Sequence, residues 1–337
     1  MNLKLAIVIL NWNGKKFLEK FLPPLISNTP DYAEIFIADN ASTDDSVIFL
    51  KETFPKLKII QNSENGGFAK GYNDALQQIE AQYYCLLNSD IEVSPHWVEP
   101  IMERMDSDFD IAAVQPKLLS YYRRNEFEYA GAAGGFIDKL GYPFCRGRVF
   151  ESVEEDKGQY ESPMDVFWAT GAALFIRSDI YHKMNGLDED FFAHMEEIDL
   201  CWRIKNAGYR IVAEPQSVIY HVGGGTLPKN NPQKTFLNFR NNYYLLIKNL
   251  PDNHLFTILL YRLFLDNAAA AMFLCKGQFR DFLAVYKAHL AVFKNYRYTK
   301  NKRRGQTFDA YGELYPQTII FQYYFKRKKN FDGIRLF

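Results

Sequence analysis

The 337-residue sequence has little cysteine and no closely spaced cysteine pair. Its four cysteines (Cys85, Cys145, Cys201 and Cys275) are scattered, which argues against a disulfide framework and against a structural zinc site. We therefore expect reduced, mostly buried thiols in a cytoplasmic protein. The apolar run Leu5–Leu10 is too short for a secretory signal, and no small-residue cleavage site follows it.

Two common nucleotide-binding fingerprints are also absent. No Gly-x-Gly-x-x-Gly follows the first apolar run, and no Walker loop ending in Gly-Lys-Ser/Thr occurs. Dehydrogenase and P-loop functions therefore lose their main support. The glycines of Asn65-Gly-Gly-Phe-Ala-Lys-Gly-Tyr-Asn73 open an expected helix, where free N–H groups could face an anion. Taken alone, this segment is more typical of a turn and helix cap.

The net charge is zero, but the charges are unevenly distributed. Of the 40 Lys and Arg residues, 17 lie from Thr235 onward, where only 6 of the 40 Asp and Glu residues occur. This basic, aromatic-rich region indicates an anionic partner, either a membrane or a nucleic acid. Because its basic residues interleave with long apolar stretches, we expect peripheral contact with the inner face of the cell membrane and no nucleic acid partner.

Four short apolar runs alternate with stretches of helical spacing in the first ninety residues. The runs are Leu5–Leu10, Glu34–Ala38, Leu57–Gln61 and Tyr83–Leu87. Strands alternating with helices predict an α/β fold with a mostly parallel sheet covered on both faces. Pro23 and Pro24 should kink or break the first helix. Residues 120–165 are irregular and predict loops or short antiparallel strands.

Polar side chains follow three of these runs. They are Asn11 and Asn13, then Asp39 and Asn40, then Asn88, Ser89 and Asp90. Because parallel sheets bind ligands at the carboxyl ends of their strands, these residues predict one polar crevice. Asp90 could coordinate Mg²⁺ or Mn²⁺ there, although Asn-Ser-Asp is also ordinary turn composition.

Two later segments carry further candidates. Phe191–Arg203 places Glu196, Glu197 and Asp199 among apolar residues, which suits a general base with a raised pKa or, equally, a capped helix start. His221 is either a metal ligand or an ordinary core histidine.

The stretch Leu255–Cys275 is long enough to span a membrane, but Arg262, Asp266 and Asn267 near its middle are costly there. We expect a helix that lies on the membrane surface or packs against the body, rather than a span.

Taken in order, these segments resemble the family 2 inverting glycosyltransferases, particularly their rhamnosyltransferase-like bacterial branch. The resemblance covers about residues 3–250. It is carried by Val8–Gly14, Ile37–Asp44, Asn65–Asn73, Leu87–Asp90, Gly171–Arg177, Phe191–Arg203 and His221. It implies the GT-A nucleotide-diphospho-sugar transferase fold, a Rossmann-like sheet, here with a helical C-terminal extension.

The resemblance also implies a role for each candidate residue. The donor side would comprise Asn11, Asn13, Asp39, Asn65, Gly67, Lys70, Asn73, Asn88 and Ser89. Asp90 and His221 would bind Mg²⁺ or Mn²⁺, and Glu197 would be the catalytic base, supported by Glu196 and Asp199. The acceptor side would comprise Trp168, Thr170 and Gly171.

Two residues depart from the family pattern. Asn88 replaces an acid in the metal motif, and Glu197 stands where Asp is commoner, so Glu196 could instead be the base.

We therefore expect a catalytic domain over 1–234, with a nucleotide-sugar half (1–119) and an acceptor half (120–234), followed by a basic helical region over 235–337. The expected reaction is metal-dependent, inverting sugar transfer from a nucleoside-diphosphate sugar to a glycan or lipid-linked acceptor. The donor implied is deoxythymidine-diphosphate rhamnose, or else a uridine-diphosphate sugar. The alternatives are a sugar nucleotidyltransferase, which normally needs a glycine-rich, arginine-containing loop after the first strand, and a non-catalytic membrane-associated binding protein.

Overall fold

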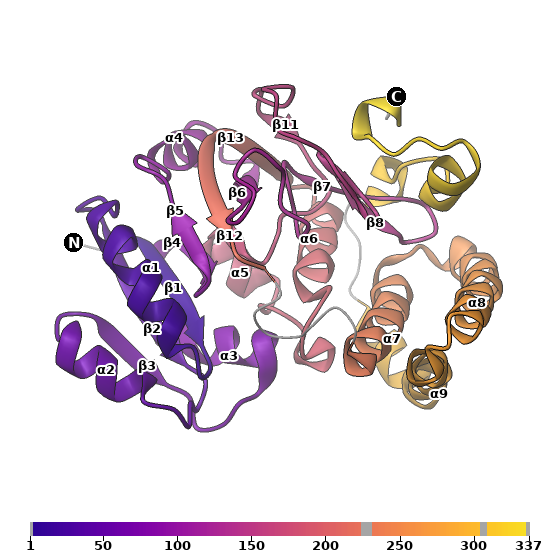
Figure 1. Cartoon of the computed structure of the whole chain (residues 1–337), viewed down its shortest axis with the longest axis horizontal. Helices are drawn as coiled ribbons and strands as arrows, with labels where there is room; N and C mark the ends of the chain where they lie inside the picture. Colours follow the sequence, from indigo (N-terminus) through magenta and orange to yellow (C-terminus); the bar gives the residue numbers. More distant parts are fainter. Residues whose placement is uncertain (1–2, 224–230, 304–308, 335–337) are drawn as a thin grey trace.

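A large mixed sheet forms the centre of the molecule (Figure 1). The computed structural model describes residues 3–223, 231–303 and 309–334. The sheet order is β11-β13-β6-β12-β4-β1-β2-β3, and β5 pairs with β13. Its strands are β1 (Leu3–Asn11), β2 (Ala33–Asp39), β3 (Lys58–Gln61), β4 (Ala81–Asn88), β5 (Ile91–Val93), β6 (Ile111–Ser120), β11 (Met164–Asp165), β12 (Ala173–Arg177) and β13 (Arg210–His221).

Strands β1–β4 pair in parallel, as the alternation of strands and helices predicts. Strand β12 then runs antiparallel between β4 and β6. The helices are α1 (Lys15–Ser27), α2 (Ser46–Thr53), α3 (Gly67–Leu76), α4 (Glu99–Ser107), α5 (Ser178–Lys183) and α6 (Glu196–Asn206). Side chains of α1, α2 and α4 pack on one face of the sheet, and those of α3, α5 and α6 pack on the other. The expected α/β fold is therefore confirmed.

Helix α1 runs through both of its prolines, so of the expected kink or break at Pro23 and Pro24 the break does not occur. The two carbonyls that lose an amide partner, those of Glu19 and Lys20, belong to exposed residues and can be hydrated. Leu22 and Leu25 on either side of the proline pair are buried against the sheet. This packing holds the helix together across the lost hydrogen bonds.

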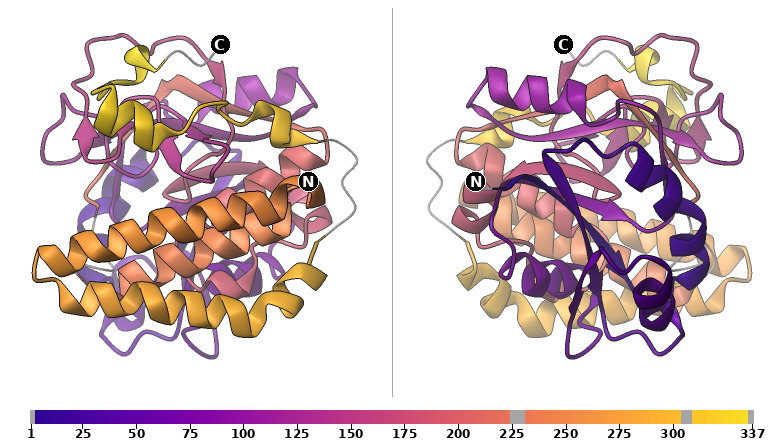
Figure 2. Two further views of the ribbon diagram at one scale, coloured as in Figure 1. Left: turned by 90° about the vertical axis from the view of Figure 1, so that its right-hand side faces the viewer. Right: turned by 90° about the vertical axis from the view of Figure 1, so that its left-hand side faces the viewer.

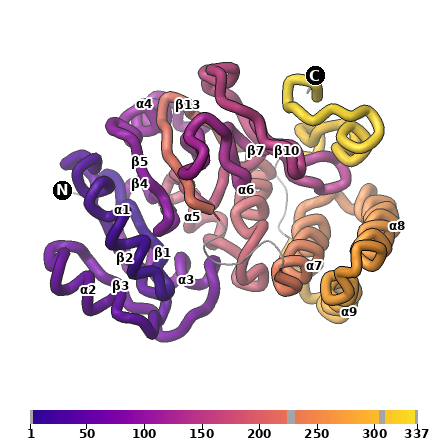
Figure 3. Tube along the Cα trace, viewed as in Figure 1, coloured from indigo at the N-terminus to yellow at the C-terminus, as the bar shows by residue number. Residues whose placement is uncertain are grey.

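The irregular middle of the sequence forms a second, small antiparallel sheet, as predicted. It contains β7 (Gly135–Ile137), β8 (Pro143–Cys145), β9 (Arg148–Val149) and β10 (Ser152–Val153). The C-terminal segment lies beside this sheet (Figure 3). Tyr315 forms an isolated β-bridge with Asp138, and the Phe331 ring packs on the rings of Phe136 and Phe144. The end of the described chain therefore belongs to the body of the molecule.

Three long helices precede this final segment in the sequence and lie on the same side of the molecule (Figure 1). They are α7 (Pro232–Asn249), α8 (Asp252–Cys275) and α9 (Phe279–Asn301). Helix α7 packs against both α6 and α9. The short helices η1 (Glu189–Phe191), η2 (Ala310–Glu313), η3 (Phe321–Phe325) and η4 (Phe331–Gly333) complete the described elements.

Helix α8 turns Arg262 and Asp266 inward and most of its apolar residues outward. Arg262 and Asp266 are buried, and the Arg262 guanidinium donates to the carbonyl oxygen of Leu140, 2.8 Å away. Among the described residues, α8 is the one helix whose length and hydropathy would suffice to cross a membrane, and 22% of its apolar window is buried in the molecule. This orientation also leaves Cys275 exposed, whereas Cys85, Cys145 and Cys201 are buried as expected.

Candidate active site

The carboxyl ends of β1 and β2 bring two predicted donor residues into direct contact. Asn11 and Asp39 are buried, and the Asn11 amide donates to Asp39 Oδ1 at 3.0 Å and to the Ser42 hydroxyl at 3.1 Å. Ser42 returns a backbone N–H to Asp39 Oδ2. Asn13, with a positive φ, accepts the backbone N–H of Thr43. These bonds fix the orientation of a carboxylate at the strand ends.

The polar candidates of the glycine-rich segment are bound to other groups of the protein. Asn65 accepts from the amide of Asn40 and from the Gly67 backbone N–H. Lys70 is bound to Asp74 at 2.7 Å. Both ends of the Asn73 side-chain amide are hydrogen-bonded. Its oxygen accepts from the Tyr181 hydroxyl and the Leu187 N–H, and its nitrogen donates to the Leu187 carbonyl. Asn73 therefore ties α3 to the segment before α6.

Asp90, in the turn after β4, and His221, the last residue of β13, come together. His221 Nε2 lies 3.2 Å from Asp90 Oδ1, and its Nδ1 lies 3.3 Å from Glu128 Oε2. All three side chains are buried. Burial alone would lower the pKa of His221, but the charge of Glu128 and the hydrogen bond with Asp90 raise it to about 10. In return, His221 outweighs the effect of burial on Asp90 and Glu128 and lowers both pKa values.

Glu128 was not among the predicted site residues. It lies in the irregular stretch between β6 and β7, far in sequence from both of its neighbours in the site. Its Oε2 also accepts the backbone N–H of Ala130. The carboxylate therefore holds the imidazole ring from the side opposite Asp90, an arrangement typical of histidines that bind metals through their other nitrogen.

The acid pair at the start of α6 has the opposite electrostatic surroundings. Glu196 is 4% exposed, whereas Glu197 keeps an intermediate exposure. Burial raises the pKa of both carboxyls, and the charge of Glu197 raises that of Glu196 further. For Glu197 the backbone N–H groups of Ile198 and Gly171 partly offset this rise. Each carboxyl has one buried oxygen without a hydrogen-bond partner among the described residues.

Asp199, unlike this pair, is bound by two cationic side chains. It is fully buried and bound to Arg203 at 2.8 Å and to Lys248 of α7 at 2.7 Å. Burial raises its pKa, but Lys248 and Arg203 outweigh burial and lower it. Asn249 also donates to Asp199 at 2.8 Å. These contacts give Asp199 a supporting position and leave Glu196 and Glu197 as the acids without a cation.

Of the predicted acceptor residues, Gly171 lies next to the acid pair. A Cβ added to Gly171 would lie 3.6 Å from Cβ of Glu197 and 3.2 Å from the ring of Phe68. Thr170 is buried, and its hydroxyl donates to the Ala130 carbonyl. Trp168 is also buried and donates to the Phe136 carbonyl. Trp168 and Thr170 therefore support this wall from behind.

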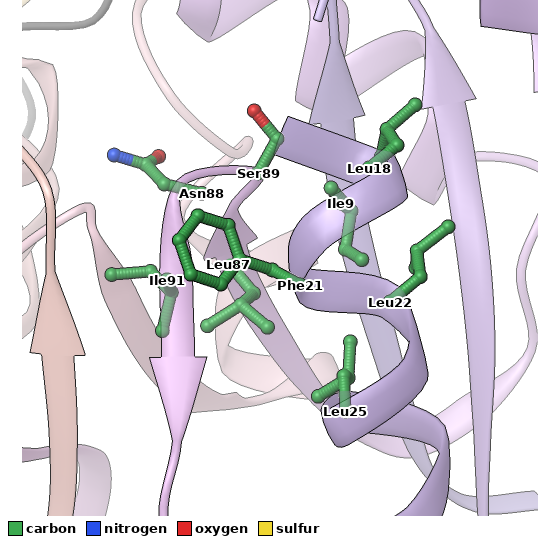
Figure 4. Close-up of a pocket in the computed structure, with 9 residues that line it drawn as sticks. All are labelled: Ile9, Leu18, Phe21, Leu22, Leu25, Leu87, Asn88, Ser89 and Ile91. Atoms are coloured by element: carbon green, nitrogen blue, oxygen red, sulfur yellow. The ribbon is translucent and has the colours of Figure 1, made fainter. Parts of the chain in front are cut away.

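The metal motif and the acid pair meet through the backbone of the sheet. The Asn88 N–H donates to the Ala172 carbonyl at 2.9 Å, so Asp90 and Gly171 stand on neighbouring strand ends. Beneath Asn88 and Ser89 lies a cavity of about 10 Å³, lined by leucine and isoleucine side chains of α1, β1, β4 and β5 (Figure 4). The polar ends of Asn88 and Ser89 point away from these apolar residues (Figure 4). The cavity is a packing gap, and the polar groups face the crevice above it.

Residues 6–157 match the model of the family described as "Glycosyl transferase family 2". This chain carries a family 2 glycosyltransferase domain. The enzyme is 22% identical over 232 residues to the N-acetylglucosaminyl-diphospho-decaprenol L-rhamnosyltransferase of Mycobacterium tuberculosis, a match that covers 64% of this chain and 75% of that protein. The expected resemblance to the rhamnosyltransferase-like branch is thus confirmed.

Solved structures show the same fold. The mannosyltransferase of Pyrobaculum calidifontis, determined with GDP-mannose and Mn²⁺, is 17% identical with a TM-score of 0.52, and the match covers 92% of this chain and 85% of that one. The structure of GalNAc-T7 with UDP, GalNAc and Mn²⁺ is also 17% identical, with a TM-score of 0.57. That match covers 73% of this chain but only 48% of the other. The glycosyltransferase has the expected GT-A fold.

Proposed function

We propose that this glycosyltransferase moves a sugar from a nucleoside-diphosphate sugar to an acceptor hydroxyl with inversion, and that Glu197 is the base. The observation that carries the proposal is the position of Glu197. Its carboxylate has a raised pKa, lies against Gly171, and is joined through Ala172 to the strand end that bears Asp90. A carboxylate with a raised pKa is suited to accept a proton in the transition state.

The donor set at Asp90 and His221 fits a divalent cation. A carboxylate oxygen suits Mg²⁺ or Mn²⁺, and the His221 imidazole would bind Mn²⁺ through a nitrogen once it has given up its proton. The described residues contain no group of three His, Cys, Asp or Glu side chains that could hold an ion, so the remaining ligands would come from the donor diphosphate and water. Such an ion would neutralise charge developing on the leaving diphosphate.

The chain's own residues would then perform the transfer in a fixed geometry. Asp39, held by Asn11 and Ser42, offers a carboxylate to the N–H groups of the nucleotide base. Glu197 would take the proton of the acceptor hydroxyl as its oxygen attacks the anomeric carbon. Attack from the face opposite the diphosphate inverts that carbon, and no carboxylate nucleophile is required.

Glu196 is the weaker candidate for the base. It is more deeply buried than Glu197, and its pKa is raised by burial and by the charge of Glu197. Both effects favour the neutral form. A neutral Glu196 leaves Glu197 as the member of the pair that carries the charge.

A donor panel tests this assignment. Thymidine, uridine and guanosine diphosphate sugars would be titrated with Mn²⁺, Mg²⁺ or chelator, and their binding and hydrolysis measured. We expect one donor to bind wild type only with metal, to fail with Asp90→Ala, and to bind Glu197→Gln without turnover. Glu19→Gln, an exposed change on α1, is the matched control. Binding of no nucleotide sugar under any condition would instead favour the non-catalytic binding protein.

The panel also identifies the donor. The related mycobacterial protein is named as a rhamnosyltransferase acting on a decaprenyl diphosphate-linked sugar. This supports deoxythymidine-diphosphate rhamnose as the donor and a lipid-linked glycan as the acceptor. A uridine-diphosphate sugar is the second candidate, because the pocket residues Asn11 and Asp39 would suit either pyrimidine.

A lipid-linked acceptor agrees with the surface formed by α8, α9 and the C-terminal segment, which lie on one side of the molecule (Figure 2, left). We propose that this side contacts the anionic inner face of the cell membrane. Phe256 and Phe264 of α8 and Phe293 of α9 are 78%, 74% and 82% exposed. Exposed basic residues on the same elements are Lys276, Arg280, Lys287, Lys294, Arg297, Lys300, Lys326, Arg327 and Lys329.

Point substitutions test this contact better than truncation, because residues 310–334 pack on the body. We would measure sedimentation with phosphatidylcholine vesicles, with and without phosphatidylglycerol. Burying one phenylalanine contributes about 1.5–3 kcal/mol. Replacing Phe256, Phe264 and Phe293 by Ser should therefore lower partitioning by at least roughly tenfold. Phe109→Ser, at an exposed site elsewhere, is the control. Wild-type protein that ignores anionic vesicles would contradict the proposal.

A further inference from the structure

The peptide that leads into the acid pair has an unusual backbone. Phe192, His194 and Met195 all have positive φ angles, of 63°, 71° and 72°. Residues other than glycine rarely adopt positive φ angles. Each one costs of order 1 kcal/mol or more of folding free energy, and it persists only where the surrounding structure holds it. Met195 directly precedes Glu196 at the start of α6. The direction in which α6 begins therefore depends on this strained turn.

One side chain of α7 holds the turn. Asn241 is fully buried, and its amide nitrogen lies 2.8–2.9 Å from the carbonyl oxygens of Phe191, Ala193 and His194. Its own oxygen accepts from Arg240 at 2.9 Å, which fixes which end of the amide faces the turn. A buried amide with three carbonyl acceptors is a strong restraint on a strained backbone.

The other side of the turn borders the glycine-rich donor segment. The Phe68 N–H donates to the Phe192 carbonyl at 2.8 Å. Gly67 has a φ of 82°, and a Cβ there would lie 2.6 Å from the Phe192 carbonyl oxygen. The turn is thus clamped between Asn241 of α7 and the Gly67–Phe68 backbone of α3. A shift in the turn would move the acid pair relative to the donor segment.

Helix α7 also holds the chain just beyond the acid pair. Lys248 binds Asp199 at 2.7 Å and Asp188 at 2.6 Å, and Asn249 binds Asp199. The same helix therefore anchors the peptide before and after Glu196 and Glu197. Helix α7 lies outside the residues that match the family model.

We propose that Asn241 is a positioning residue that sets the place of the Glu197 carboxylate by holding the 192–195 turn. This inference rests on the proposed role of Glu197 as the base. Asn241 would touch neither donor nor acceptor. Its loss would leave metal and nucleotide binding intact and impair the proton-transfer step.

The test compares two neighbouring amides of α7. Asn241→Asp replaces the donor to the turn by an acceptor of nearly the same shape. Asn242→Asp is the matched control, because Asn242 is equally buried and donates instead to the Gly141 carbonyl. Its amide approaches the turn only at the Met195 sulfur, 3.7 Å away. If Asn241→Asp does not fold, Asn241→Ala removes the same donor without adding an acid.

Three measurements would be made on the full chain. We expect Asn241→Asp to lower kcat with the donor identified by the panel by about 10²-fold, the loss typical of a misplacement of about 1 Å, with KM and Mn²⁺ affinity within roughly twofold. Amide hydrogen exchange over residues 192–198 should become faster in this variant only. The acid limb of the kcat profile should also move, because the backbone N–H groups around Glu197 change position.

The positioning role would be overturned if Asn241→Asp kept the kcat and the amide exchange rates of wild type. It would also be overturned if Asn241→Asp and Asn242→Asp lost kcat equally. If the wild-type enzyme turns over no donor, the proposed function fails first. The exchange measurement then still decides whether Asn241 holds the turn.

Discussion

Two pairs of buried acids in this enzyme have opposite surroundings. Asp90 and Glu128 flank His221, and the imidazolium lowers both pKa values. Glu196 and Glu197 are adjacent, form no salt bridge among the described residues, and have raised pKa values because burial disfavours their charge. An acid held ionised is suited to bind a cation, whereas an acid with a raised pKa is suited to accept a proton. In the proposed mechanism this contrast would separate a leaving-group side of the site from an acceptor side.

The largest expected effect concerns the proton acceptor. Glu197→Gln should lower kcat by about 10³-fold, the middle of the range for general-base catalysis, because an amide cannot take the proton. Donor and Mn²⁺ binding should persist, which isothermal titration would show. Glu196→Gln, the matched change one residue earlier, should retain most of the rate. If the two variants exchange these results, Glu196 is the base.

A third set of buried acids sharpens the comparison. Asp188 and Asp199 resemble Asp90, because Lys248 outweighs burial and lowers both pKa values. Lys248→Met should lower the free energy of unfolding by roughly 2 kcal/mol, the loss typical of a charge-assisted hydrogen bond, since Asp199 keeps Arg203 and Asp188 keeps Lys302. Chemical denaturation at neutral pH measures this.

The pH dependence of unfolding provides the control. Carboxyls with lowered pKa values stabilise the fold above about pH 4, their unfolded value, and this stability is lost as the pH falls below it. Lys248→Met should therefore lose less stability on acidification than wild type does. An unchanged acid dependence would contradict the assignment.

A smaller effect is expected at Glu128. Glu128→Gln should weaken Mn²⁺ binding by about 10–100-fold, as is typical when the partner of a metal-binding histidine is changed. Electron paramagnetic resonance of free Mn²⁺ measures the affinity without turnover. Glu126→Gln, two residues away and bound to Arg123, is the control. Equal Mn²⁺ affinity in both variants would mean that Glu128 does not support the site.

The smallest effect is expected in the pH profile. Because the pKa of Glu197 is raised, the rate should fall as the pH drops through a value above 4.5. In Glu196→Gln this limb should stay at the wild-type pH, because a neutral Glu196 places no negative charge beside Glu197. A limb that moves to lower pH would show that Glu196 is charged in the wild-type enzyme.

Much of the fold was predictable because the pattern of strands and helices is local. The runs ending at Leu10, Ala38, Gln61 and Leu87 correspond to β1–β4, and the crevice follows from where parallel strands end. The continuity of α1 through Pro23 and Pro24 was not predictable. The helix continues because leucines on both sides of the prolines are buried against the sheet. Rules that consider only neighbouring residues do not take this packing into account.

The position of a candidate residue was predictable where the residue lies at its own strand end or helix start, as Asp90 and Glu197 do. Glu128 gave no signal, because nothing in the sequence connects it with His221. Asn73 and Trp168 were expected to face the donor and the acceptor. In the structure Asn73 hydrogen-bonds to the Leu187 backbone and Trp168 to the Phe136 carbonyl. Such partners appear only when distant segments meet.

The hydrogen bond from Asn88 to Ala172 has a consequence for how the enzyme can vary. It holds the strand end before Asp90 against the strand start after Gly171 through main-chain atoms alone. Side chains around these two ends can therefore change without altering the spacing of the two backbones. In the proposed reaction, sugar selectivity and the separation of the two strand ends would be set by different parts of the molecule.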